Sequence, residues 1–250
     1  MSSSFLEQQL LPLRDDEQAV TLSRFFKTGP GQYGYGDRFL GIKVPVTRGV
    51  VKAVWSRCTL ADVEDALASP WHEVRLCALL VLVQIYKHAR RDDDCRRRCI
   101  DLYLAHADRI NNWDLVDLSC YELLGHWLLD RDRTLLYDLA RSGSLWQQRI
   151  AIVSTMQFVR HGQYADTLAL SDLLLFHPHD LMHKAVGWLL REVDKHDGAL
   201  LRRYLLGIAP GTDRPRCAVM PRTTLRYAIE HFPEPERQQF LGKVSRSSNN

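Results

Sequence analysis

The stretch Asn111-Asn112-Trp113-Asp114-Leu115-Val116-Asp117 opens a helix near the middle of the chain. Asparagine is a favourable N-cap, and Trp113 and Asp117 are four residues apart, so their side chains share one face of the helix. The sequence onward to Leu129 is apolar on nearly every side, which predicts a deeply placed helix over 112–129. Asp117 is then either a structural group satisfied by hydrogen bonds or a partly desolvated carboxylate held for chemistry.

Helix follows helix on both sides of this stretch, and no credible pair of strands interrupts the series. Stop signals such as Ser69-Pro70, Ser142-Gly143-Ser144 and Phe232-Pro233 separate the helices. The predicted helices span 15–27, 45–58, 60–68, 71–89, 94–106, 112–129, 131–141, 146–160, 163–175, 180–195, 198–206, 221–231 and 235–243. The short connections favour antiparallel neighbours. We expect one domain over 1–250, with 1–14 and 243–250 poorly ordered.

A repeat is visible in the helical series. Arg75, Asn112, Arg149, Lys184 and Arg226 each precede small and apolar helix positions, at spacings of 37, 37, 35 and 42 residues. Two helices in a unit of that length are typical of HEAT-like repeats, whose second helices line one concave surface. The sequence therefore predicts an all-α, HEAT-like α-solenoid of antiparallel helix pairs with a concave basic groove.

One helix of the series carries a stripe of cations around an aromatic residue. Lys184, Trp188 and Arg191 are spaced i, i+4 and i+7, and Lys195 lies one turn further on. A basic groove with an aromatic plate suits a polyanion that contains flat rings, because cations neutralise phosphates and rings pack on indole. In the alternative interpretation these cations pair with Asp180, Glu192 or Asp194 at the surface, and Trp188 belongs to the core.

Composition is that of an ordinary globular protein. The chain has 250 residues, of which 46% are hydrophobic and 25% charged, and its formal net charge is only +3, so a nucleic-acid binder would need a clustered basic face. The six cysteines form no CxxC pair, which favours a reducing, intracellular compartment. No signal peptide or membrane span is apparent. We expect a cytoplasmic monomer.

Three further segments carry residue patterns that are also found in functional sites. The loop over 28–37 is rich in glycine but lacks the order of a nucleotide site, so it is either a connector or a ligand-contacting loop. His179 and His183 mimic a zinc helix, yet Pro178 and Asp180 indicate a helix start that would place His179 outside the helix. Cys95 and Cys99 lie one turn apart among arginines, where a solvated basic helix outweighs a redox or metal site.

Five motifs in order along the chain resemble the DNA alkylation repair glycosylases of the AlkD type. The motifs are Phe25-Phe26-Lys27-Thr28-Gly29, Phe39-Leu40-Gly41-Ile42, Asn112 to Asp117, Trp146 to Val153, and Lys184 to Glu192. The resemblance runs from about Leu22 to Phe232. It implies a HEAT-like fold that binds duplex DNA in its concave groove and releases N3- and N7-alkylated purines without a metal or other cofactor. It also implies Asp117 as the catalytic carboxylate, Trp113 and Trp188 as its flanking aromatics, and Arg149 as the active-site arginine.

The implied chemistry suits a sparse site. An N3- or N7-alkylated purine already carries a positive charge and departs without a general acid, so one carboxylate can stabilise the sugar cation and orient water. The cations expected to contact DNA are Lys27, Arg75, Lys184, Arg191, Lys195 and Arg226. The alternatives are a non-catalytic HEAT-like module that binds DNA structure or a protein and, through His179 and His183, a zinc hydrolase.

Overall fold

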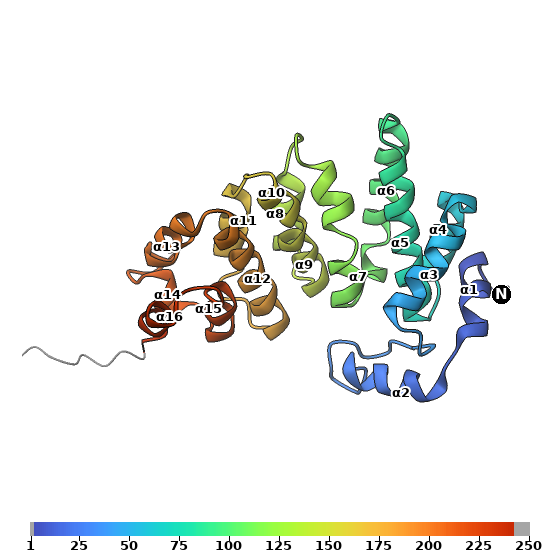
Figure 1. Cartoon of the computed structure of the whole chain (residues 1–250), viewed down its shortest axis with the longest axis horizontal. Coiled ribbons are helices and arrows are strands. Elements are labelled where there is room, and N and C mark those ends of the chain that lie inside the picture. The colour runs from blue at the N-terminus through green and yellow to red at the C-terminus, as the bar shows by residue number, and fades with distance from the viewer. Residues whose placement is uncertain (1–2, 243–250) are drawn as a thin grey trace, which may run out of the picture. The chain divides into compact units, whose positions relative to one another are not determined.

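The computed structural model describes residues 3–242, and this part of the chain is built from helices without a β-strand (Figure 1). It divides into two compact units, Met1–Trp127 and Leu128–Asn250. The prediction of an all-α protein is confirmed. The single domain, the solenoid and the concave basic groove stay predictions, and the expected disorder of 243–250 lies outside the described residues.

The first unit is organised around α5, which is buried on nearly every side and packs against α3, α4, α6 and α7. Its apolar run from Leu76 to Val83 leaves no polar stripe, so neighbours must cover all of its faces. The elements of this unit are α1 (Phe5–Leu10), η1 (Leu11–Leu13), α2 (Asp16–Phe25), α3 (Val44–Val54), η2 (Trp55–Arg57), α4 (Leu60–Leu67), α5 (His72–His88), α6 (Asp93–Ala105), η3 (Ala107–Arg109), α7 (Trp113–Asp117) and η4 (Tyr121–Gly125).

The N-terminal segment is more ordered than the sequence suggested. Helix α1 begins after Ser4, whose hydroxyl oxygen accepts the Glu7 N–H at 3.3 Å. Leu6 and Leu10 are four residues apart and fully buried, and α1 packs against α4 and α5. The prediction of a poorly ordered segment over 1–14 is therefore wrong for its described part. Two buried leucines on one face are enough to hold this short helix against α4 and α5.

The helix predicted over 112–129 is not continuous. Helix α7 ends at Asp117, and a turn leads into the π-helical stretch η4. The Ser119 hydroxyl donates to the Leu115 carbonyl at 2.5 Å, and the Gly125 N–H donates to the Cys120 carbonyl at 3.0 Å, the wider spacing of a π-helix. An apolar run that is buried all round hides such a change of winding, and π-helical turns often lie at functional sites.

The second unit is organised around α12, which packs against α9, α13 and most extensively against α15. Gly187 lets α15 approach closely, since a Cβ there would lie 2.7 Å from the Thr224 carbonyl oxygen. The elements are α8 (Thr134–Arg141), α9 (Leu145–Ser154), α10 (Met156–Arg160), α11 (Ala165–Leu173), α12 (Asp180–His196), α13 (Gly198–Leu206), α14 (Arg216–Val219), α15 (Arg222–Ala228) and α16 (Glu234–Phe240). The described residues include no helix long and apolar enough to cross a bilayer.

Candidate active site

Helix α7 presents the predicted aromatic and carboxylate pair at the surface of the first unit. Asn112 is the N-cap, and its side-chain oxygen accepts the Trp113 N–H at 2.9 Å, as the sequence predicted. Trp113 and Asp117 are both partly exposed, whereas Asp114, Leu115 and Val116 between them are buried. Asp117 is thus neither a core residue nor a fully solvated one.

The surroundings of Asp117 include a buried phenol. Burial raises the pKa of Tyr103 well above its usual range, and electrostatic interactions with Cys120 and Asp117 raise it further. The Tyr103 hydroxyl oxygen lies 3.3 Å from Ser119 Oγ. The phenol next to Asp117 therefore stays protonated at neutral pH.

A buried charged network holds the N-terminal end of α7. The His72 imidazole lies between two carboxylates, with Nδ1 2.8 Å from Asp37 Oδ2 and Nε2 2.9 Å from Asp114 Oδ2. Burial alone would lower the pKa of His72, but the two carboxylates outweigh it and raise the pKa to about 9. The pKa of Asp37 is lowered in turn, since its bonds to His72 and Arg75 overcome the effect of burial. His72 is therefore a cation at pH 7, and it ties the 28–37 loop to α7.

Arg75 belongs to the same network rather than to a DNA-contacting surface. Its guanidinium forms an ion pair with Asp37 and also donates to Asn111 Oδ1 at 3.0 Å and to the Ser69 carbonyl at 3.1 Å. The residue is only 2% exposed. This placement corrects the prediction that Arg75 contacts DNA, because a guanidinium sealed in the core and paired there cannot reach a phosphate.

An aromatic stack extends from this network to Trp113. The His72 ring stacks on Phe39 with centroids 4.5 Å apart, and Phe26 packs on both Phe39 and His72. Trp113 stacks on Phe26 at 5.2 Å with an interplanar angle of 18°, and Phe25 meets Trp113 edge-on at 6.0 Å. Phe25 is 59% exposed, so the stack ends in an open aromatic surface beside α7.

The chain that carries this stack is fixed by one buried carboxylate. Glu73 accepts the backbone N–H groups of Leu40, Gly41 and Ile42 at 2.8, 2.9 and 3.1 Å. Gly41 has a φ of 89°, and a Cβ there would overlap the Asp15 carbonyl oxygen. Residues 40–42 thus anchor the chain that follows the 28–37 loop to α5. The two interpretations of the loop, as a connector or as a ligand-contacting loop, both stay open predictions.

Arg149 and Trp188 lie in the second unit. Arg149 on α9 is 5% exposed, and its Nη1 donates to the Leu181 carbonyl at 2.6 Å, in the first turn of α12. Trp188 on α12 is partly exposed, and its indole N–H donates to Glu192 Oε1 at 3.2 Å. Trp188 is therefore not a core residue, contrary to the alternative interpretation of the stripe.

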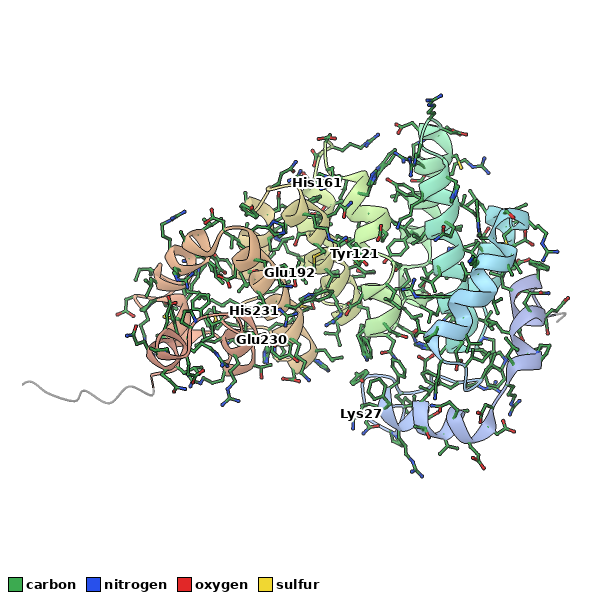
Figure 2. The ribbon with its side chains drawn as sticks, viewed as in Figure 1. Lys27, Tyr121, His161, Glu192, Glu230 and His231 are labelled. Carbon is green, nitrogen blue, oxygen red and sulfur yellow. The ribbon has the colours of Figure 1, made fainter. Side chains whose placement is uncertain are left out.

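The cations of the stripe, in contrast, do pair with acidic neighbours. Lys184 Nζ lies 2.7 Å from Asp180 Oδ2, and Lys195 Nζ lies 2.8 Å from Glu192 Oε1. Arg191 forms an ion pair with Glu230, which follows α15. Figure 2 labels both Glu192 and Glu230. Much of the positive charge of the stripe is therefore balanced within the unit itself.

Comparison with known proteins places the chain in a family. The family model described as "DNA alkylation repair enzyme" matches residues 6–232. The chain belongs to this DNA alkylation repair family. Among solved structures it is similar to a "Predicted DNA alkylation repair enzyme from Enterococcus faecalis", with a TM-score of 0.64 and 15% identity over 88% of this chain and 97% of that one. At that identity the likeness shows the fold alone. The comparison with curated proteins gives no significant match.

The remaining cations predicted to contact DNA are placed individually. Lys27 lies exposed just after α2, where Figure 2 labels it, and it has the unusual φ of 56°. Arg226 on α15 and Lys195 on α12 are also exposed. These positions are accessible to a phosphate, so their DNA contacts stay predictions for this repair-family member.

The histidines near α12 act as capping and hydrogen-bonding groups. His179 is the N-cap of α12, as Pro178 and Asp180 predicted, and its Nδ1 accepts the Leu181 N–H at 3.1 Å. His177 Nδ1 accepts the His179 N–H at 3.0 Å, and His183 Nε2 lies 2.6 Å from the His177 carbonyl oxygen. Burial lowers the pKa of His177 and His179, so neutral imidazoles serve these roles at pH 7.

Sequence reasoning missed Asp37, His72 and Asp114. Asp37 ends the Gly-rich loop, His72 starts α5, and Asp114 stands between the two residues that drew attention on α7. The available signal was Asp114 itself, because an aspartate inside an otherwise apolar helix start requires a partner. Its partner, however, is 42 residues away in the sequence.

Proposed function

We propose that this member of the DNA alkylation repair family is a monofunctional DNA glycosylase that hydrolyses the N-glycosidic bond of cationic N3- and N7-alkylated purines in duplex DNA. The observation that carries the proposal is Asp117, a partly exposed carboxylate one helical turn from the partly exposed indole of Trp113. The family match over residues 6–232 supplies the substrate class, damaged DNA.

The proposed reaction needs a single carboxylate. The bond between C1′ of the deoxyribose and the purine nitrogen breaks, and its electron pair neutralises the positive charge of the alkylated base. The sugar becomes an oxocarbenium-like cation, which the Asp117 carboxylate stabilises electrostatically. Water then adds to C1′ and releases a proton, for which Asp117 is the acceptor. The products are a neutral alkylpurine and an abasic site, and no leaving-group acid is required.

The open aromatic surface beside α7 supports this assignment. The indole of Trp113 offers the negative face of its ring to a developing positive charge on the sugar. The stack with Phe26, Phe39 and His72 fixes the ring plane, so little conformational entropy is lost when the sugar packs against it. The 59% exposed ring of Phe25 extends the apolar surface available to a deoxyribose or a base.

Arg149 and Trp188 take the roles that the family resemblance implies. Arg149 is proposed to hold a phosphate or the catalytic carboxylate by charge-assisted hydrogen bonds, and Trp188 to pack on the sugar. The surface cations Lys27, Lys184, Arg191, Lys195 and Arg226 are proposed to contact the DNA backbone in a HEAT-like concave groove.

The test measures release of 7-methylguanine and 3-methyladenine from methylated duplex DNA. Asp117→Asn keeps the shape of the side chain and removes its charge, and we expect the rate to fall about 100-fold or more. The matched control is Asp138→Asn, at an exposed aspartate on α8. This variant is expected to keep the wild-type rate.

Two outcomes would contradict the proposal. Equal base release by the wild type and Asp117→Asn would remove Asp117 from the chemistry. Salt-sensitive DNA binding by the wild type without any base release would instead identify a non-catalytic DNA-binding module.

A further inference from the structure

Helix α3 carries a second stripe of cations and an aromatic ring, in the first unit. Arg48 and Lys52 are exposed and four residues apart on α3, and Trp55 follows at i+7 with helical backbone angles. The adjacent face of α3, with Thr47, Val51 and Val54, is buried against the core. Both cations are therefore exposed on the same side of α3 as the partly exposed Trp55.

The two cations differ from those of the stripe on α12 in their partners. Among the described residues, neither Arg48 nor Lys52 forms an ion pair, whereas Lys184, Arg191 and Lys195 are each paired with a carboxylate. Paired cations must give up a partner before they bind a phosphate, but unpaired ones release only counterions. The cations of α3 can therefore bind the phosphates of a polyanion at a lower free-energy cost than the paired cations of α12.

Trp55 is supported from behind by a second ring. The His88 imidazole at the end of α5 stacks on the indole with centroids 4.1 Å apart and an interplanar angle of 28°. The His88 ring is itself positioned by its Nδ1, which lies 2.8 Å from the Gln84 carbonyl oxygen. One face of Trp55 is thus covered, and its ring lines a hollow of about 150 Å³ together with Arg48, Lys52 and Gln84.

The size of the hollow decides between two kinds of ligand. Sites that enclose a small molecule usually measure about 300–1,000 Å³. The α3 hollow is smaller and open to solvent, so it can seat one group of a longer chain but not surround a free nucleotide. Two cations one helical turn apart beside an aromatic ring match a repeating polyanion that carries apolar rings.

We infer that Arg48, Lys52 and Trp55 form a contact surface for one strand of the DNA duplex, with the cations on phosphates and the indole against a deoxyribose. The inference rests on the proposed action on duplex DNA and adds a contact outside the residues assigned to it. It requires no base recognition, because phosphates and sugars are the same at every position. The α3 surface thus contributes affinity and register but not lesion specificity.

The test is the salt dependence of binding to a short, unmodified, fluorescent duplex between about 50 and about 200 mM salt. For Arg48→Gln/Lys52→Gln we expect the slope of log K against log salt to become shallower by about 1.8, the value for two lost phosphate contacts. The charge-matched control is Lys87→Gln/Arg97→Gln, which removes two cations that pair with Glu122 and Asp94 in the same unit. Its slope is expected to equal that of the wild type.

The aromatic contact has its own readout. Trp55→Leu is expected to weaken binding about fivefold at every salt concentration without changing the slope, since packing on a ring releases no counterion. Circular dichroism melts of all variants establish that each is folded before binding is compared.

The possible results separate this inference from the proposed glycosylase. Equal slopes for the two double variants, with base release intact, would overturn the α3 contact and leave the proposed function standing. Loss of binding to vesicles of anionic phospholipid with an unchanged DNA slope would assign the surface to lipid and also overturn it. If the wild type neither binds duplex DNA nor releases bases, the proposed glycosylase function is refuted, and the α3 contact, which rests on it, is refuted as well.

Discussion

His72 makes the stability of the protein fall at alkaline pH. The imidazole pairs with the Asp37 and Asp114 carboxylates only in the folded state, where its pKa rises from 6.5 to about 9. The folded state therefore binds this proton more tightly than the unfolded state does. The stabilisation is fully present below pH 6.5 and is lost as the pH rises through about 9.

The size of the effect follows from the same shift. At 1.36 kcal/mol for each pH unit, the change in pKa is worth about 3 kcal/mol of unfolding free energy. That is a large part of the roughly 5–15 kcal/mol that stabilises a typical domain. The other charged groups facing His72 are Asp37, Asp114 and, through Asp37, Arg75.

Urea unfolding between pH 6.5 and 9.5 measures the loss directly. We expect the midpoint to fall steeply towards pH 9, and NMR of protein labelled on the histidine rings to show one imidazole still protonated at pH 8. The free energy of unfolding should recover fully when the pH is lowered again. A flat stability profile up to pH 9, or complete titration of every imidazole by pH 8, would refute the doubly paired His72 cation.

Three substitutions test the other local contacts that position the site. Glu73→Gln should lower the free energy of unfolding, measured with urea, by about 2 to 3 kcal/mol, because the glutamine NH2 group would face a backbone N–H that now donates to a carboxylate oxygen. A decrease no larger than that of the exposed control Glu64→Gln would contradict the role of Glu73 as acceptor for three backbone N–H groups. Gly41→Ala should cost about 3 kcal/mol or more, owing to its positive φ and the overlap with Asp15, and a neutral result in a thermal melt would contradict the close approach. Gly187→Ala should cost about 2 kcal/mol by separating α12 from α15, which unchanged stability would exclude.

The helices were largely predictable from the sequence, because their boundaries are local. The helix predicted over 180–195 is observed at Asp180–His196, and the one predicted over 198–206 is observed at Gly198–Leu206. Proline, glycine and capping residues act within a few positions of the helix end, so the helix boundaries can be predicted from local sequence. The segment predicted over 146–160 is instead split at Thr155, whose hydroxyl donates to the Ile152 carbonyl at 2.7 Å.

The charged network was not predictable because its members are far apart in sequence. An aspartate after a Gly-rich loop and a histidine at a helix start each look like ordinary surface residues when read alone. The repeat pattern also misled at Arg75, since equal positions in successive units were assumed to have equal exposure. Arg75 is instead buried against Asp37, while Arg226 at the corresponding position is exposed.

The position of Asp117 depends on contacts at both ends of a very short helix. Five residues cannot maintain an α-helix in water, because the cost of nucleation is not recovered over so few hydrogen bonds. Helix α7 is instead held at its start by the Asn112 cap and the His72–Asp114 pair, and it passes at its end into a turn and the π-helical stretch. A catalytic carboxylate that works without a second acid has to be fixed before the substrate arrives, since no other group compensates for misplacement. For the proposed single-carboxylate mechanism, the buried cation at His72 therefore has a positioning role, and we expect loss of its proton to weaken the proposed base release along with stability.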